Sequence, residues 1–319
     1  MARACSNTMK FGSAAILIAM VMAIVVNSNV VAASRQYPGG RSLLQSHGPL
    51  LIDYMGASGD TSLQFSDLQA IVSAFPTLEF IFPLSFAIDA DASGNTQNGV
   101  FSPYWSTSLD GASAQAFKQQ NPNVKLMVSL AGFSQFVNGN NQNVNWYDPA
   151  STTDWVNNAV SSIGSLVSTY NLDGVDVDYE NFPSGSATFT TCIGQLISTL
   201  KSDGTIRLAS IAPFGSTSPI YADLFSNYGS SIDYVNYQFY ADGLNTQSDY
   251  VNDFNTVSAS FDPTKLLASV EVNGRGLQGN DFIAAAQQLS IAGVMIFDVD
   301  NSKSSNFALE QSVATFLTS

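Results

Sequence analysis

Short runs of β-branched, aromatic and other apolar residues alternate with segments of helical periodicity along most of the chain. We find eight such runs. In several of the gaps, apolar residues recur at spacings of three and four, as in residues 156–167 and 282–289. The pattern predicts eight units of one strand and one helix. The predicted strands cover residues 50–55, 80–86, 124–130, 172–179, 206–212, 232–240, 266–272 and 292–298.

Nearly continuous apolar strands that alternate with helices indicate a parallel sheet whose outer face is covered. Eight units in one pass favour a barrel over a doubly wound open sheet. A Gly-X-Gly-X-X-Gly match at Gly274, Gly276 and Gly279 would suit a dinucleotide-binding fold. However, it follows the seventh run, whereas such a fold carries this motif on its first turn, so a glycine-rich loop is the better interpretation. We predict an α/β fold, a single (β/α)8 TIM barrel over residues 49–319, with its chemistry at the carboxyl ends of the strands.

The first 33 residues have the order of a secretory signal peptide. Two basic residues precede an apolar run of 13 residues (14–26), and small residues follow it. A membrane anchor is the poorer interpretation, because a spanning helix needs about 20 residues. We expect residues 1–33 to be removed and residues 34–48 to form a flexible lead-in. The mature protein is then expected to be secreted, to the apoplast or the vacuole, with no membrane contact.

The composition narrows the class of partner. The 319 residues include 11 basic and 25 acidic side chains, a net charge of −14, but only 11% are charged and 45% are hydrophobic. The apolar content excludes an acidic disordered chain. Nucleic acids and anionic membranes call for clustered Lys and Arg, so neither is an expected partner. A neutral or cationic partner fits better, and we expect a monomer.

The small numbers of cysteine and histidine residues argue against multi-histidine metal sites and a histidine-based triad. Cys192 is the only cysteine after residue 33, and His47 is the only histidine of the chain. Cys192 falls in an apolar helical pattern, so core packing explains it better than a nucleophilic role. A single histidine excludes multi-histidine metal sites and argues against a histidine-based triad. We expect no metal and no organic cofactor.

Three acids alternate with apolar residues at the end of the fourth run. Asp176, Asp178 and Glu180 occupy positions i, i+2 and i+4, so a strand points all three to one face. Neighbours on that face are about 7 Å apart, close enough for coupled ionisation, and one of them can therefore hold a proton near neutral pH. The spacing of a calcium loop is absent. The residues themselves predict a glycosidase that uses coupled carboxyls for acid–base catalysis.

With Asp173 three residues earlier, these acids resemble the Asp-X-X-Asp-X-Asp-X-Glu signature of glycoside hydrolase family 18, the chitinase family. The similarity continues from Tyr54 in the first run to Phe297 in the eighth. Within the family, the chain most resembles the plant bulb-type chitinases, which are poor in cysteine and lack a separate chitin-binding module. The resemblance implies a barrel that binds chitin or N-acetylglucosamine oligosaccharides and needs no cofactor.

The resemblance also implies a retaining, substrate-assisted hydrolysis of β-1,4-linked N-acetylglucosamine polymers. Glu180 would be the general acid and then the base. Asp178 would bind the N–H of the substrate's acetamido group, and Asp176 would share a proton with Asp178. Tyr240 would orient the acetamido oxygen. Asp173 lies off the face of the other acids and would support the strand.

Further positions resemble the family more weakly. Ser129 and Gly132 belong to a segment that ends the third run, in which Ala131 replaces the usual glycine. The eighth run carries Phe297 where the family most often has tryptophan; phenylalanine keeps an aromatic face but loses area and the indole donor. Substrate contacts are implied for a set of five residues. These are Tyr54, Phe86, Ser129, Gln238 and Phe297.

Two other functions remain open at this point. The changes at Ala131 and Phe297 leave room for a chitinase-like lectin or storage protein that binds N-acetylglucosamine glycans with weak or no turnover. An endo-acting N-acetylglucosaminidase acting on glycoproteins would differ only in its loops.

The asparagine-rich segment 138–145 fits a sugar contact and a solvated loop equally well.

Overall fold

The computed structural model describes residues 35–36, 42–43, 48–137 and 140–319. The predicted signal peptide (1–33), His47 and most of the predicted lead-in lie outside these residues. Within the lead-in, β1 (Arg35–Gln36) pairs antiparallel with β2 (Ser42–Leu43). No helix of the described part is long and apolar enough to cross a membrane.

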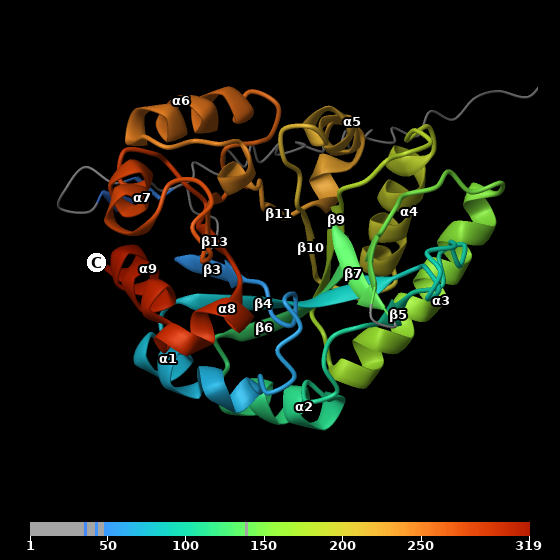
Figure 1. Cartoon of the computed structure of the whole chain (residues 1–319), viewed down its shortest axis with the longest axis horizontal. Helices are drawn as coiled ribbons and strands as arrows, with labels where there is room; N and C mark the ends of the chain where they lie inside the picture. The colour runs from blue at the N-terminus through green and yellow to red at the C-terminus, as the bar shows by residue number, and fades with distance from the viewer. Residues whose placement is uncertain (1–34, 37–41, 44–47, 138–139) are drawn as a thin grey trace, which may run out of the picture. The chain divides into compact units, whose positions relative to one another are not determined.

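The described chain contains eight parallel strands that close into a barrel (Figure 1). Seven pairings join them in the order β11-β10-β9-β6-β4-β3-β13-β12. A parallel bridge between Val235 and Leu266 joins the two ends, with the Val235 amide donating to Lys265 O at 2.8 Å. The predicted (β/α)8 barrel is confirmed. Its strands are β3 (Leu50–Asp53), β4 (Glu79–Ile88), β6 (Val124–Gly132), β9 (Gly174–Tyr179), β10 (Leu208–Ile211), β11 (Tyr234–Val235), β12 (Ala268–Glu271) and β13 (Val294–Phe297).

Helices lie around the outside of these strands (Figure 1). The helical periodicity at 156–167 belongs to α3 (Thr152–Tyr170), which buries Val156 and Ile163. Cys192 is fully buried in α4 (Phe189–Ser202), as the apolar pattern predicted. The other helices are α1 (Gln69–Ala74), α2 (Gly111–Gln120), α5 (Ser218–Tyr228), α6 (Gln247–Val257), α7 (Gly279–Ala286), α8 (Val299–Ser302) and α9 (Ala308–Thr318), with short 3-10 turns η1 (Phe65–Leu68), η2 (Gly229–Ser231), η3 (Phe239–Ala241) and η4 (Lys303–Ser305).

Two small strand pairs lie outside the barrel ring. β5 (Ser102–Pro103) pairs antiparallel with β4. β7 (Ser134–Val137) pairs antiparallel with β8 (Asn140–Asn143) and forms a hairpin that follows β6. Residues 140–143 of the asparagine-rich segment therefore belong to a hairpin next to the carboxyl end of a barrel strand.

The sixth strand is much shorter than the predicted 232–240. The backbone hydrogen bonds of the parallel pairing with the β10 segment continue as far as the Gln238 amide, which donates to Pro213 O at 2.8 Å. Pro213 has no amide to carry the ladder further. The chain then turns into η3, where the Phe239 amide donates to Ser269 Oγ at 2.9 Å. Gln238 and Tyr240 are consequently held by a turn and not by alternating positions of a strand.

A buried pair of carboxyls connects the C-terminal helix to the barrel. Asp53 of β3 is fully buried, and the carboxyl of Glu310 on α9 is close enough for its charge to act on Asp53. Neither oxygen of Asp53 has a donor group among the described residues. Burial, followed by the charges of Glu310, Asp298 and Asp300, raises the pKa of Asp53 well above its usual range. Burial and the neighbouring charges therefore favour the protonated form of Asp53.

The proton held by Asp53 makes the stability of the fold depend on pH. A carboxyl whose pKa is raised on folding stabilises the fold below its unfolded value of about 3.9, and that stability is lost as pH rises through the folded value. We expect the Tm of the protein to fall more steeply as pH rises above about 4 than that of Asp53→Asn, whose side chain has no proton to lose. Thermal denaturation followed by circular dichroism measures both curves. The exposed Asp262→Asn serves as the control, and parallel curves for the protein and Asp53→Asn would contradict the raised pKa of Asp53.

Candidate active site

Asp176 is held at the centre of the barrel by its neighbours in register. Ser129 of β6 and Ser210 of β10 are its partners on the two adjacent strands. The same register places the three side chains on the same interior face. Each serine hydroxyl donates to Asp176 at 2.6 Å.

Two more donors complete the environment of Asp176. The Tyr54 hydroxyl donates to it at 2.9 Å and the Asn236 amide at 3.2 Å. Burial raises the pKa of Asp176, and the four donors oppose that rise. Tyr54 is only 1% exposed and lies against this carboxyl, not in the open cleft.

Asp178 has a different hydrogen-bond partner from those of Asp176. Its Oδ1 accepts a hydrogen bond from Gln238 Nε2 at 3.0 Å. Burial, and then the charges of Glu180 and Asp176, raise its pKa well above the usual range. Asp176 already accepts hydrogen bonds from four donors. The sharing of a proton between Asp176 and Asp178 stays a prediction.

Glu180 has the environment of a carboxylic acid that keeps its proton near neutrality. Burial raises its pKa to about 7, while a hydrogen bond with Gln238 and the charge of Arg275 lower it. An acid that is to donate and then accept a proton works best when its pKa is close to the ambient pH. Glu180 is thus poised for general acid and base chemistry.

A cleft of about 420 Å³ opens above these acids. Asp178 and Glu180 line it together with several aromatic rings. Carbohydrate-sized sites typically combine such apolar walls with a few fixed polar groups. The remaining lining residues are Ala57, Phe86, Phe133, Ser134, Phe214, Gln238, Tyr240, Ala241, Arg275 and Phe297.

Gly132 allows one aromatic wall to form. Its φ is +74°, and a Cβ there would lie 2.8 Å from the Phe86 ring. This gives the predicted structural role of Gly132 a steric reason. Ala131 is buried with a φ of +78° and lines a smaller hollow beside Phe86, not the main cleft. Cis peptide bonds precede Phe86 and Asp298.

A second wall is built around Tyr240. Its ring stacks on Phe297 at a centroid distance of 6.2 Å, and its hydroxyl donates to Gln238 Oε1 at 3.2 Å. The guanidinium of Arg275 lies 5.2 Å from the centre of the same ring and is paired with Glu271 at 3.3 Å. Gly276 permits this approach, because a Cβ there would be 2.9 Å from Tyr240 Cα.

Most of the predicted site residues lie in or beside the cleft, and other residues that were not predicted lie there with them. Asp173 lies away from the cleft, where it binds Lys118 at 2.7 Å and accepts from the Leu126 amide at 2.9 Å. Sequence reasoning missed Phe133, Ser210, Phe214, Asn236 and Arg275. Arg275 stands between two glycines just after the seventh run, and Ser210 is central in the fifth, so their positions relative to the strands were a usable signal.

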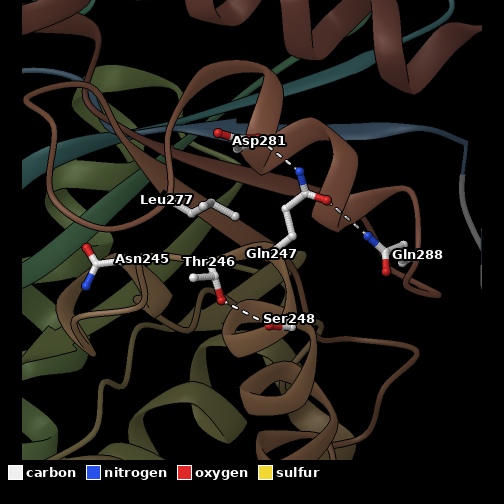
Figure 2. Close-up of a pocket in the computed structure, with 7 residues that line it drawn as sticks. All are labelled: Asn245, Thr246, Gln247, Ser248, Leu277, Asp281 and Gln288. Carbon is white, nitrogen blue, oxygen red and sulfur yellow. Dashed lines mark hydrogen bonds between the residues drawn. The ribbon is translucent and has the colours of Figure 1, made fainter.

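Another hollow, of about 540 Å³, lies between α6 and α7 (Figure 2). Its polar side chains bind one another: Gln247 donates to Asp281 at 2.9 Å, and Thr246 and Ser248 share a hydrogen bond of 3.0 Å. None of the acids described above lines it. Within the described ranges, no cluster of three or more His, Cys, Asp or Glu side chains is arranged to hold a metal ion.

Residues 51–280 match the family model described as glycosyl hydrolases family 18. The chain belongs to this family. It is 35% identical to Chitinase 1 of Tulipa saxatilis subsp. bakeri over 84% of this chain and 86% of that one. The structure matches the catalytic domain of a family 18 chitinase from the fern Peteris ryukyuensis with a TM-score of 0.77 and 40% identity, covering 85% of this chain and 100% of that one. A RuBisCO-associated protein of Glycine max is 32% identical over 49% of this chain and 56% of its own.

We expect Arg275→Gln to raise the pKa of Glu180 above about 7, because the substitution removes the positive charge that favours the carboxylate. NMR of protein labelled with [5-¹³C]glutamate measures this directly, since the chain has only four glutamates, at positions 79, 180, 271 and 310. Loss of one signal in Glu180→Gln assigns the resonance. Lys303→Gln, which removes a distant cation, is the control. An unchanged midpoint in Arg275→Gln would show that Arg275 does not act on Glu180.

Proposed function

We propose that the protein is a chitinase, which hydrolyses β-1,4-linked N-acetylglucosamine polymers outside the cell. The observation that carries the proposal is Glu180, a largely buried carboxyl in an aromatic-lined cleft whose pKa is raised to about 7. The relatives named as chitinases support the choice of substrate. The predicted signal peptide is the reason for placing the activity outside the cell.

The proposed reaction uses the substrate's own acetamido group as the nucleophile, as the family resemblance implies. Glu180 gives its proton to the glycosidic oxygen, and the bond from that oxygen to the anomeric carbon breaks. The acetamido oxygen bonds to the anomeric carbon and forms an oxazolinium ion. Asp178 accepts a hydrogen bond from the acetamido N–H and stabilises the positive charge. The Tyr240 hydroxyl donates to the acetamido oxygen and orients it.

The second half of the reaction returns the enzyme to its starting state. The Glu180 carboxylate removes a proton from water, and the water oxygen attacks the anomeric carbon on the face that the leaving sugar occupied. The ring of the oxazolinium opens, and the product keeps the configuration of the substrate. Asp176 shares a proton with Asp178, as the family resemblance implies.

The aromatic walls suit a neutral sugar chain. Phe297 stacks with Tyr240 and forms the hydrophobic floor for the sugar whose bond is broken. Phe133 is 53% exposed at the rim of the same cleft, where a ring of this kind can pack against the next sugar. The smaller area of Phe297, compared with tryptophan, predicts weaker binding.

An alternative is a protein that binds the same glycans with weak or no turnover. The replacement of tryptophan by Phe297 favours it, as does a relative whose name, RuBisCO-associated protein, describes no hydrolysis. The complete set of signature acids and the raised pKa of Glu180 favour the chitinase.

We expect Glu180→Gln to reduce the hydrolysis of chitin hexasaccharide by roughly 10²–10⁴-fold, because glutamine has no proton to give to the leaving oxygen. Mass spectrometry of the products measures the rate. Glu79→Gln is the matched control, since Glu79 stands at the amino end of β4, away from the cleft, and should leave the rate unchanged.

Two results would count against the chitinase. Equal rates for the protein and Glu180→Gln would remove Glu180 from the reaction. Measurable binding of the hexasaccharide by the unmodified protein, with no cleavage, would favour the alternative of a glycan-binding protein.

A further inference from the structure

The turn that follows β12 contains an asparagine directly before a glycine, Asn273 and Gly274. In such a pair the backbone nitrogen of the glycine can attack the side-chain carbonyl carbon of the asparagine, because glycine has no Cβ to hinder the approach. The new C–N bond closes a succinimide ring, the bond to the side-chain nitrogen breaks, and that nitrogen leaves with the proton of the glycine as ammonia. Water then opens the ring to aspartate or isoaspartate. The reaction needs only water, so its rate depends on the setting of the pair.

Nothing in the structure hinders this attack at Asn273. Both residues of the pair are exposed. Neither the side chain of Asn273 nor the amide of Gly274 has a hydrogen-bond partner among the described residues. A Cβ built on Gly274 would meet no other part of the protein within 4 Å. The turn therefore has room to bring the nitrogen onto the side-chain carbonyl.

Asn98 and Gly99 form the same pair in a fixed setting. Gly99 is buried, and its amide already donates to Asp89 Oδ2 at 3.2 Å. A Cβ on Gly99 would collide with the carbonyl oxygen of Trp155, so the backbone there is enclosed by protein. The nitrogen that would have to attack is bound to an acid and cannot approach the side chain of Asn98 without losing that bond. The structure thus separates two identical dipeptides by their reactivity.

A carboxylate at position 273 would act on the catalytic cleft through Arg275. The Arg275 amide donates to Glu271 Oε2 at 2.9 Å, and its guanidinium lies 5.2 Å from the centre of the Tyr240 ring. The Cα atoms of Asn273 and Arg275 are at most about 7 Å apart, because two residues of extended chain span no more. Physiological salt screens charges over about 8 Å, so a charge at 273 reaches the guanidinium. The charge of Arg275 in turn lowers the pKa of Glu180.

We propose that Asn273 is a site of spontaneous deamidation, and that the carboxylate formed there offsets the charge of Arg275 at the edge of the catalytic cleft. Each event replaces a neutral amide by a negative charge, and the isoaspartate product also lengthens the backbone of the turn by one methylene. Among the described residues that line the cleft, Arg275 is the only lysine or arginine. Deamidated protein therefore keeps the proton of Glu180 to a higher pH than newly made protein. The inference does not depend on which substrate the cleft binds.

Mass spectrometry of peptides from protein incubated at mildly alkaline pH tests the modification. The peptide that contains Asn273 should gain the mass difference between an amide and an acid as ammonia is lost. The peptide that contains Asn98 is the control within the same sample. It should change at least about tenfold more slowly, because the Gly99 amide must first give up a hydrogen bond to a carboxyl. In Asn273→Gln the gain at position 273 should disappear. Equal rates for the two peptides, or no gain in the peptide of Asn273, would overturn the site.

The effect on the cleft is measured on Asn273→Asp, which carries the product's charge from the start. The NMR midpoint of Glu180 should rise above about 7, in the same direction as in Arg275→Gln. Asn255→Asp is the matched control, since it adds the same charge at an exposed position on α6 and should leave the midpoint unchanged. A midpoint that does not move in Asn273→Asp, or that moves equally in Asn255→Asp, would contradict the link to Arg275.

Discussion

The geometry of the site depends on the hydrogen bonds that one fully buried carboxyl, Asp176, receives. A carboxylate inside a barrel is tolerated only if enough donors replace the water that it loses. Here the donors come from four different strands or strand ends, through Tyr54, Ser129, Ser210 and Asn236. The register of β6, β9 and β10 is consequently fixed by polar contacts as well as by apolar packing, and the same register places the other acids of β9.

Once Asp176 is fixed, the remaining acids are constrained in turn. Asp178 and Glu180 follow at spacings of two on the same face. Burial raises the pKa of both, and the charges of Glu180 and Asp176 raise that of Asp178 further. Gln238 links this series to the opposite wall, because its amide donates to Asp178 and its oxygen accepts from Tyr240. The positive charge of Arg275 opposes the rise in the pKa of Glu180, which is about 7. The pKa of Glu180 is therefore raised by burial and lowered in part by Gln238 and Arg275.

The barrel and its acids could be predicted from the sequence because both rest on short periods. Alternation along 172–180 already placed Asp176, Asp178 and Glu180 on one face, and eight apolar runs gave the strands. The contacts that come from distant segments could not be predicted in this way. The role of Tyr54 as a donor to Asp176, the turn that holds Tyr240, and the approach of Arg275 to its ring depend on how separate strand ends meet. The pair of Asp53 and Glu310, 257 positions apart, has no local signal at all.

Two separate groups of buried acids favour the same range of pH. In the first, Asp53, Asp298, Asp300 and Glu310 all have raised pKa values, and that of Asp300 is about 6. In the second, burial raises the pKa of Glu180, the proposed general acid, to about 7. Stability from the first group is present at low pH and falls as pH rises, and so does the fraction of active acid in the second. The net charge of −14 adds repulsion as the remaining carboxyls ionise. Folding and the proposed acid catalysis are therefore both favoured at lower pH, although the two groups of acids lie on different strands and helices and share no residue.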